Sequence, residues 1–203
     1  MKTNNSVKDQ KIIIYGGSFN PPTIAHAAII DAVAQDKCYD KIWLLPSKNR
    51  SDKKINVPAN LRVEMLDALI KECFLNIKSK LMVSDFELAQ KGNTMTYKTA
   101  KLLNKKYPQN TFVWLIGADS WINMSSWEHG EELRKTVEWL IIPRDGYPIN
   151  DTLPPNAKLM PNPVFASKVS STMLRQRIAN NQSAMPFTTP AVSKIITSNK
   201  LYV

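Results

Sequence analysis

The chain has 203 residues, enough for one domain with a sizeable core, and its 43% hydrophobic and 22% charged residues are typical of a globular protein. Because no apolar run approaches the roughly 20 residues of a membrane span and the polar residues 1–11 lack a signal-peptide core, we expect a cytoplasmic protein without a membrane partner. The net charge of +10 would suit binding of nucleic acid or of small polyanions. The lysines are scattered, however, and the basic loop 48–54 has no aromatic residue on which a base could stack. We therefore expect no nucleic-acid partner.

Short apolar runs alternate with helical patterns along the chain. We predict strands at Lys11–Tyr15, Lys41–Leu45, Leu81–Val83, Thr111–Ile116 and Val137–Ile142, with a further short strand at Lys158–Met160. We predict helices at Ile24–Asp36, Pro58–Cys73, Met95–Tyr107, Trp127–Lys135, Ser171–Ala179 and Pro190–Ser198. The strands are apolar almost throughout and are separated by helices, which predicts an α/β fold. We expect a Rossmann-like doubly wound sheet of about five or six mostly parallel strands with helices on both faces.

The region from Pro143 to Pro163 contains six prolines and is a loop-rich excursion, too short for a domain of its own. We therefore expect residues 1–203 to form a single domain that ends in a helical segment at residues 164–203. The two cysteines, Cys38 and Cys73, lie in separate helical patterns without metal-ligand spacing. This favours reduced packing residues over a disulfide or a metal site.

The most informative segment is Gly16-Gly17-Ser18-Phe19-Asn20-Pro21-Pro22-Thr23-Ile24-Ala25-His26. A predicted strand runs through this turn into a helix whose first turn carries His26, one of two histidines in the chain. Backbone N–H groups, the positive end of the helix dipole and an imidazole then point at one place, which suits a phosphate. The segment lacks the Gly-Lys-Ser/Thr ending of a Walker A loop and the third glycine of the dinucleotide fingerprint.

A second helix start of this kind is Val169-Ser170-Ser171-Thr172-Met173-Leu174-Arg175. Small hydroxyl residues cap helix N-termini, and Arg175 lies one turn along on the face that Ser171 shares. Hydroxyls, free N–H groups and a guanidinium would then converge on a second anion position. Either segment alone could be an ordinary turn or cap, but two of them at opposite ends of one α/β chain favour an anion site.

Both segments resemble signatures of the nucleotidylyltransferase superfamily. Gly17-Ser18-Phe19-Asn20-Pro21 with Thr23-Ile24-Ala25-His26 is similar to Gly-x-Phe-[Asp/Asn]-Pro followed by [His/Thr]-x-x-His. Val169–Arg175 is similar to the superfamily's Ile-Ser-Ser-Thr-x-x-Arg. Thr23 and Ala25 replace the histidine and glycine of the commonest version, which removes one cation that could bind phosphate.

Motifs in the middle of the chain narrow the resemblance to nicotinate (or nicotinamide) mononucleotide adenylyltransferases. Leu115–Ser120 resembles that family's Ile-Gly-x-Asp-Ser, and Thr94–Thr99 resembles its Ser-Tyr-Thr-x-x-Thr. Ile142–Tyr147 resembles its Arg-Arg-Pro-Gly-Tyr, keeping one of the two arginines. Trp127 matches a tryptophan that stacks near the pyridine ring, and Lys53 takes the lysine place of a Pro-Pro-His-Lys loop.

The resemblance implies adenylyl transfer from ATP to nicotinate mononucleotide, which gives deamido-NAD and pyrophosphate in a step of NAD biosynthesis. It implies His26 and Arg175 as catalytic residues. The implied ATP-binding residues are Gly17, Ser18, Phe19, Thr23, His26, Asp119, Ser171, Thr172 and Arg175. The implied nicotinate-nucleotide-binding residues are Asn20, Lys53, Thr96, Trp127 and Arg144. Mg²⁺ is expected as a cofactor that is carried with ATP, without a metal site on the protein.

Alternatives stay open at this point. The acceptor could be nicotinamide mononucleotide, although Arg144, Lys53 and the basic balance lean toward the acid. It could also be another phosphate such as phosphopantetheine or FMN. A non-catalytic nucleotide-binding protein, or a basic nucleic-acid-binding protein on the same scaffold, is a further reading, and a homo-oligomer is compatible with the sequence.

Overall fold

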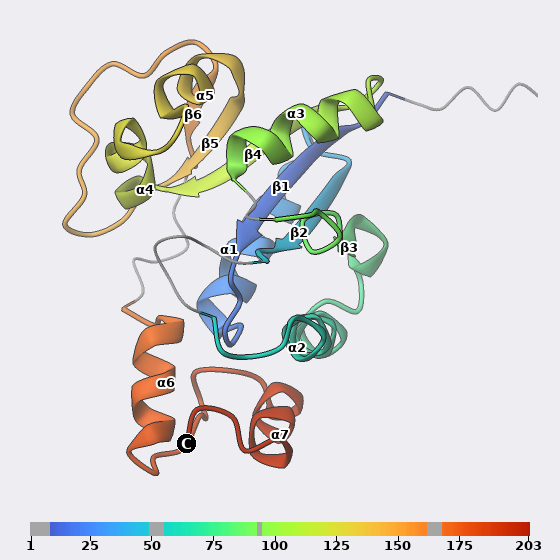
Figure 1. The fold of residues 1–203 in the computed structure, drawn as a ribbon, viewed down its shortest axis with the longest axis vertical. Helices are drawn as coiled ribbons and strands as arrows, with labels where there is room; N and C mark the ends of the chain where they lie inside the picture. The colour runs from blue at the N-terminus through green and yellow to red at the C-terminus, as the bar shows by residue number, and fades with distance from the viewer. Residues whose placement is uncertain (1–8, 49–54, 93–94, 162–167) are drawn as a thin grey trace, which may run out of the picture.

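A computed structural model describes residues 9–48, 55–92, 95–161 and 168–203 (Figure 1). Within these residues lies a six-stranded sheet of β1 (Lys11–Gly17), β2 (Lys41–Pro46), β3 (Leu81–Val83), β4 (Thr111–Gly117), β5 (Glu138–Ile142) and β6 (Ala157–Leu159). Its order is β3-β2-β1-β4-β5-β6, and every neighbouring pair is parallel. The predicted doubly wound, Rossmann-like fold class is confirmed.

Helices cover both faces of this sheet. One face is covered by α1 (Ile24–Ala34), α2 (Ala59–Cys73), α6 (Ser171–Ala179) and α7 (Pro190–Ser198). The other is covered by α3 (Thr96–Lys106), α4 (Ala118–Ile122), the 3-10 turn η2 (Asn123–Ser126) and α5 (Gly130–Thr136). The two-residue period of a strand feeds both cores, since Ile13 and Tyr15 face the first set of helices while Ile12 and Ile14 face the second.

The predicted elements are found, with ends that move by a few residues. The predicted helix Trp127–Lys135 begins only at Gly130, because His129 before it has a φ of 57° and turns the chain. A Cβ atom on residue 130 would lie 1.8 Å from the carbonyl oxygen of Met124, so only glycine fits there. The short strand predicted at Lys158–Met160 is β6, one residue earlier. The short elements α4, η2 and the 3-10 turn η1 (Lys78–Lys80) were not predicted.

The topology places a crevice at one edge of the sheet. From β1 the chain winds outward through β2 to β3, and it then returns to β4 and winds the other way through β5 to β6. Ligands of doubly wound proteins bind at the carboxyl ends of the strands where the winding direction reverses. Here that switch point lies between Gly17 at the end of β1 and Gly117 at the end of β4.

The C-terminal helices connect back to the start of the chain. In Figure 1, α6 and α7 lie at the bottom, below α1 and α2. Helix α7 packs on α2 through the core that Val192 and Ile196 share with Met65 and Leu69. Residues that follow the last strand are therefore in position to support the turn after β1. Among the described residues, no helix is both long and apolar enough to cross a bilayer.

Candidate active site

A cavity of about 670 Å³ lies at the switch point. Its wall is made by the end of β1 and the first turns of α1, by the end of β4, by the segment after β5 and by the start of α6. Of the residues predicted for the site, those that line it are Gly17, Thr23, His26, Asp119, Arg144 and Ser171. The cavity thus brings together the two signature segments, which are far apart in the sequence.

The His26 ring has a defined protonation state. Thr23 is the N-cap of α1, and its backbone N–H donates to Nδ1 of His26 at 2.9 Å. Its hydroxyl oxygen also lies 2.9 Å from that nitrogen. Since Nδ1 accepts a hydrogen bond from a backbone N–H, the proton of the neutral ring is on Nε2. Burial lowers the pKa of His26 to about 4, so near neutral pH the ring is an uncharged donor.

The turn between β1 and α1 is held through its carbonyl oxygens. Arg62 of α2, which is 1% exposed, donates from Nη1 to the carbonyl of Ser18 at 2.8 Å. Arg175 of α6 donates from Nη1 to the carbonyl of Asn20 at 2.8 Å. Charge-assisted donors to backbone carbonyls are strong hydrogen bonds, so two guanidinium groups fix the path of this turn.

Hydroxyl groups of the C-terminal segment complete this frame. The Ser171 hydroxyl donates to the carbonyl of Pro21 at 2.7 Å, and the Thr188 hydroxyl donates to that of Pro22 at 2.9 Å. The Tyr202 hydroxyl donates to Oδ1 of Asn20 at 2.6 Å. The carbonyl groups of Asn20, Pro21 and Pro22 thus accept hydrogen bonds from the C-terminal segment, which fixes the path of the turn.

The buried ring of Phe19 packs next to His26 and Gly17. It is 1% exposed and has a φ of 43°, in the left-handed region that non-glycine residues seldom adopt. Its ring centroid lies 5.2 Å from that of His26, and a Cβ atom on Gly17 would approach the ring to 3.3 Å. Gly17 therefore lets the backbone pass close to the buried Phe19 ring, which in turn contacts the ring of His26.

Two residues that were predicted for different substrates contact each other across the cavity. Arg144 Nη1 lies 2.7 Å from Oδ2 of Asp119, and the guanidinium also lies 6.0 Å from the ring centroid of Tyr147. The Arg144 side chain is 53% exposed, and such ion pairs contribute little stability. Both groups are therefore free, at small cost, to exchange this contact for one to a ligand.

The other predicted site residues lie outside the cavity wall. Ser18, Phe19 and Asn20 belong to the supported turn, while Thr172 accepts a hydrogen bond from Arg175 Nη2 at 3.1 Å. Thr96 begins α3 and Trp127 packs against the second core, both without lining the cavity. Lys53 lies outside the described residues, so its placement stays a prediction.

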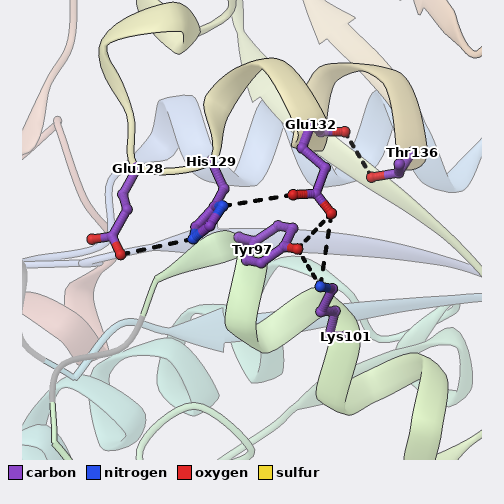
Figure 2. Close-up of polar contacts among 6 residues, drawn as sticks. All are labelled: Tyr97, Lys101, Glu128, His129, Glu132 and Thr136. Carbon is purple, nitrogen blue, oxygen red and sulfur yellow. Dashed lines mark hydrogen bonds and ion pairs between the residues drawn. The ribbon is translucent and has the colours of Figure 1, made fainter.

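A polar cluster joins the segments that carry Thr96 and Trp127 (Figure 2). The ring of Tyr97 stacks on that of His129, with centroids 4.3 Å apart and planes at 15°. The Tyr97 hydroxyl donates to Glu132 of α5, whose other oxygen lies 3.6 Å from Nδ1 of His129. The start of α3 is thereby tied to the turn before α5.

Sequence reasoning missed several residues of the site. Tyr15 and Lys168 line the cavity, and each directly precedes one of the two signature segments, which was the available signal. Arg62 was hidden in the helical pattern of α2, where it shares the buried face of Met65 and Leu69. A charged residue at such a position indicates a specific buried partner.

Comparison with known proteins agrees with this arrangement. The model of the cytidylyltransferase-like family matches residues 14–177. A probable nicotinate-nucleotide adenylyltransferase of Exiguobacterium sibiricum is 30% identical over 193 residues, which cover 95% of this chain and 98% of that protein. Another of that name, from Bacteroides fragilis, is 30% identical over 189 residues, covering 90% and 89%.

Solved structures are similar over the same length. The Plasmodium falciparum nicotinic acid mononucleotide adenylyltransferase complexed with NaAD has a TM-score of 0.86 at 27% identity. The match covers 95% of this chain and 97% of that one. The structure of the same Plasmodium enzyme complexed with APC has a TM-score of 0.82 at 26% identity, with the same coverage.

Proposed function

The chain belongs to the cytidylyltransferase-like family, and we propose that it is a nucleotidyltransferase that transfers the adenylyl group of ATP to nicotinate mononucleotide. The products are deamido-NAD and pyrophosphate, in a step of NAD biosynthesis. The observation that carries this proposal is the His26 ring, which is held as a neutral Nε2–H donor at the helix start of α1, in a cavity that also contains Ser171 of the second signature.

The reaction is a displacement at phosphorus. A phosphate oxygen of the mononucleotide forms a bond to the α-phosphorus of ATP, while the bond from that phosphorus to the bridging oxygen breaks and pyrophosphate leaves with the electron pair. No protein nucleophile is needed, so positioning and stabilisation of developing charge supply the catalysis. A positioned donor of this kind contributes about 10²- to 10⁴-fold to turnover.

His26 fits the role of that donor. Its Nε2–H can donate to an oxygen of the reacting phosphates, and Thr23 prevents the ring from switching to the other tautomer. A neutral ring also avoids a buried positive charge in the empty site. Ser171 lies at the same cavity, and the α6 N-terminus behind it favours the negative charge of the leaving pyrophosphate.

Arg175 acts on the turn that carries these groups. Its guanidinium holds the carbonyl of Asn20 and the hydroxyl of Thr172, which supports a role in positioning the phosphate turn. These bonds use two of the five N–H donors of the guanidinium, so the others are available for the contact with the pyrophosphate end that the resemblance implies. Thr172 accepts from Arg175 through its oxygen and keeps its own O–H as a donor.

The Asp119–Arg144 pair lies on the cavity wall. We assign Asp119 to the ribose hydroxyls of ATP and Arg144 to the ring carboxylate of the nicotinate, so that substrate binding replaces their mutual contact. A carboxylate gains more from a guanidinium than a neutral carboxamide does, which supports the acid as substrate.

Mg²⁺ is proposed to enter with ATP, whose phosphate charge it neutralises. The described part of the chain holds no group of three or more His, Cys, Asp or Glu side chains arranged to bind a metal ion. Mg²⁺ keeps several of its waters and binds substrate phosphates, so we infer an ion that is carried by the nucleotide and assign it no protein ligand.

The test is pyrophosphate release from Mg-ATP with a panel of acceptors: nicotinate mononucleotide, nicotinamide mononucleotide, phosphopantetheine and FMN. We expect release with the nicotinate form, and a loss of about 10²- to 10⁴-fold in turnover for His26→Ala. Near-normal turnover in that variant would refute the role of His26. Salt-sensitive binding to random duplex DNA, with no pyrophosphate release for any acceptor, would instead favour a nucleic-acid-binding protein.

A further inference from the structure

Tyr15 is the last buried side chain of β1, immediately before the glycine turn. It is 9% exposed and lines the main cavity. Its ring meets that of Phe19 edge-on at 5.4 Å between centroids, and its centroid lies 6.1 Å from that of His26 at an interplanar angle of 40°. The phenol ring thus lies beside the His26 ring, and both residues line the cavity.

Among the described residues the Tyr15 hydroxyl makes no hydrogen bond to a side chain or backbone group, and it is not one of their enclosed unpaired polar atoms, so it opens onto the cavity. Ile29 and Ala32 of α1, which line the cavity on the same face of the sheet, carry no polar side-chain atom that could accept one. A hydroxyl that opens onto a cavity and has no protein partner can bind water there, and a ligand oxygen can replace that water. The Tyr15 hydroxyl is therefore available to a bound ligand.

Packing alone does not explain the hydroxyl. A phenylalanine would make the same ring contacts with Phe19 and His26 but would bring no polar atom to the cavity wall. Burial raises the pKa of Tyr15, so its hydroxyl keeps its proton and is an uncharged donor throughout the physiological range. The ligand atom that it meets is therefore an acceptor.

We propose that the Tyr15 hydroxyl donates a hydrogen bond to a phosphate oxygen of a bound substrate, next to the oxygen that accepts from Nε2–H of His26. This inference rests on the proposed function, which supplies two phosphate-bearing substrates. Two neutral donors, one from β1 and one from α1, can bind a phosphate without adding a positive charge to the cavity wall.

The test is Tyr15→Phe, which removes one oxygen and keeps the ring. Binding of ATP and of nicotinate mononucleotide is measured by calorimetry, each alone so that no turnover occurs, and each is compared with its nucleoside. We expect a roughly 10- to 100-fold weaker affinity for the nucleotide whose phosphate Tyr15 meets, the range for a hydrogen bond to a charged acceptor, with the nucleoside unaffected. A loss confined to ATP assigns the contact to the triphosphate, and one confined to the mononucleotide assigns it to the acceptor phosphate.

A matched control is Tyr39→Phe, a half-buried tyrosine in a second cavity that contains Lys11 and Glu138 at the amino ends of the strands. It should leave both affinities unchanged. Thermal unfolding of the ligand-free protein should show Tyr15→Phe at least as stable as the wild type, because the hydroxyl has no partner to lose.

Unchanged affinity for both nucleotides, an equal loss for a nucleoside, or a clear drop in unfolding temperature would each overturn the inference. Failure of the proposed function looks different. In that case the wild-type protein forms no deamido-NAD from ATP and nicotinate mononucleotide, whatever Tyr15→Phe does to ATP binding.

Discussion

The protonation state of His26 leads to a prediction about acid stability. The folded protein holds the pKa of this ring at about 4, whereas an unfolded chain has the ordinary value of 6.5. Between these values the unfolded state takes up a proton that the folded state does not. The stability that the neutral ring contributes is thus complete above pH 6.5 and is lost as the pH falls from 6.5 to 4.

The size of this effect follows from the two pKa values. The interval from 6.5 to about 4 corresponds to about 3 kcal/mol of unfolding free energy, because one pH unit corresponds to about 1.4 kcal/mol. His26→Asn removes the titrating group while leaving a side-chain oxygen that can accept from the Thr23 N–H. Urea unfolding of both proteins from pH 7.5 to pH 4 should show the wild type lose about 3 kcal/mol more than the variant.

NMR gives a second readout of the same group. The chain has two histidines, so the His26 ring signal is identified by its absence in His26→Asn. Its titration midpoint should lie near pH 4. A midpoint above pH 6, or an acid loss of stability equal in the two proteins, would refute the neutral, Nε2-protonated ring.

Three further predictions concern a turn of the fold, the support of the turn after β1 and the cavity wall. Gly130→Ala should destabilise the fold by about 1–3 kcal/mol or more in urea unfolding, because its Cβ would overlap the Met124 carbonyl, and wild-type stability would contradict that geometry. Arg62→Ala should lower the unfolding free energy by about 2–5 kcal/mol in the same assay and should lower turnover, because the Ser18 carbonyl then loses its buried guanidinium donor. Unchanged values would show that the contact is dispensable. Lys168→Ala should raise the KM for ATP several-fold at low salt, with a smaller effect at high salt, and a salt-independent KM would refute its electrostatic role.

Elements with a strong local signal could be predicted from the sequence. The observed ranges of β1, β2, β4, β5 and α2 lie close to the predicted ones. The buried strands are marked by continuous apolar runs, and the buried face of α2 is marked by apolar residues at helical spacing. The short α4 and η2 were missed because five or fewer residues do not define a helical period. Their position follows from packing of Trp121 and Met124 on the second core, which is a tertiary effect.

The parts of the candidate site that lie in a short sequence motif could be predicted. The contacts that residues far away in the sequence make to that motif could not. The helix start with Thr23 and His26 is contained in four consecutive residues, so its chemistry can be inferred from sequence. The contact of Tyr202 with Asn20 spans 182 positions and has no local signature. The free hydroxyl of Tyr15 likewise becomes visible only when all of its neighbours are known.

The most direct test of the central claim is product formation by the purified protein with Mg-ATP and each pyridine mononucleotide. We expect deamido-NAD and pyrophosphate in equal amounts from nicotinate mononucleotide, with kcat/KM above that for nicotinamide mononucleotide. We also expect that replacing Arg144 by alanine reduces this preference. A higher kcat/KM for nicotinamide mononucleotide would contradict the assignment of the acid, and no dinucleotide from either acceptor would contradict the proposed function itself.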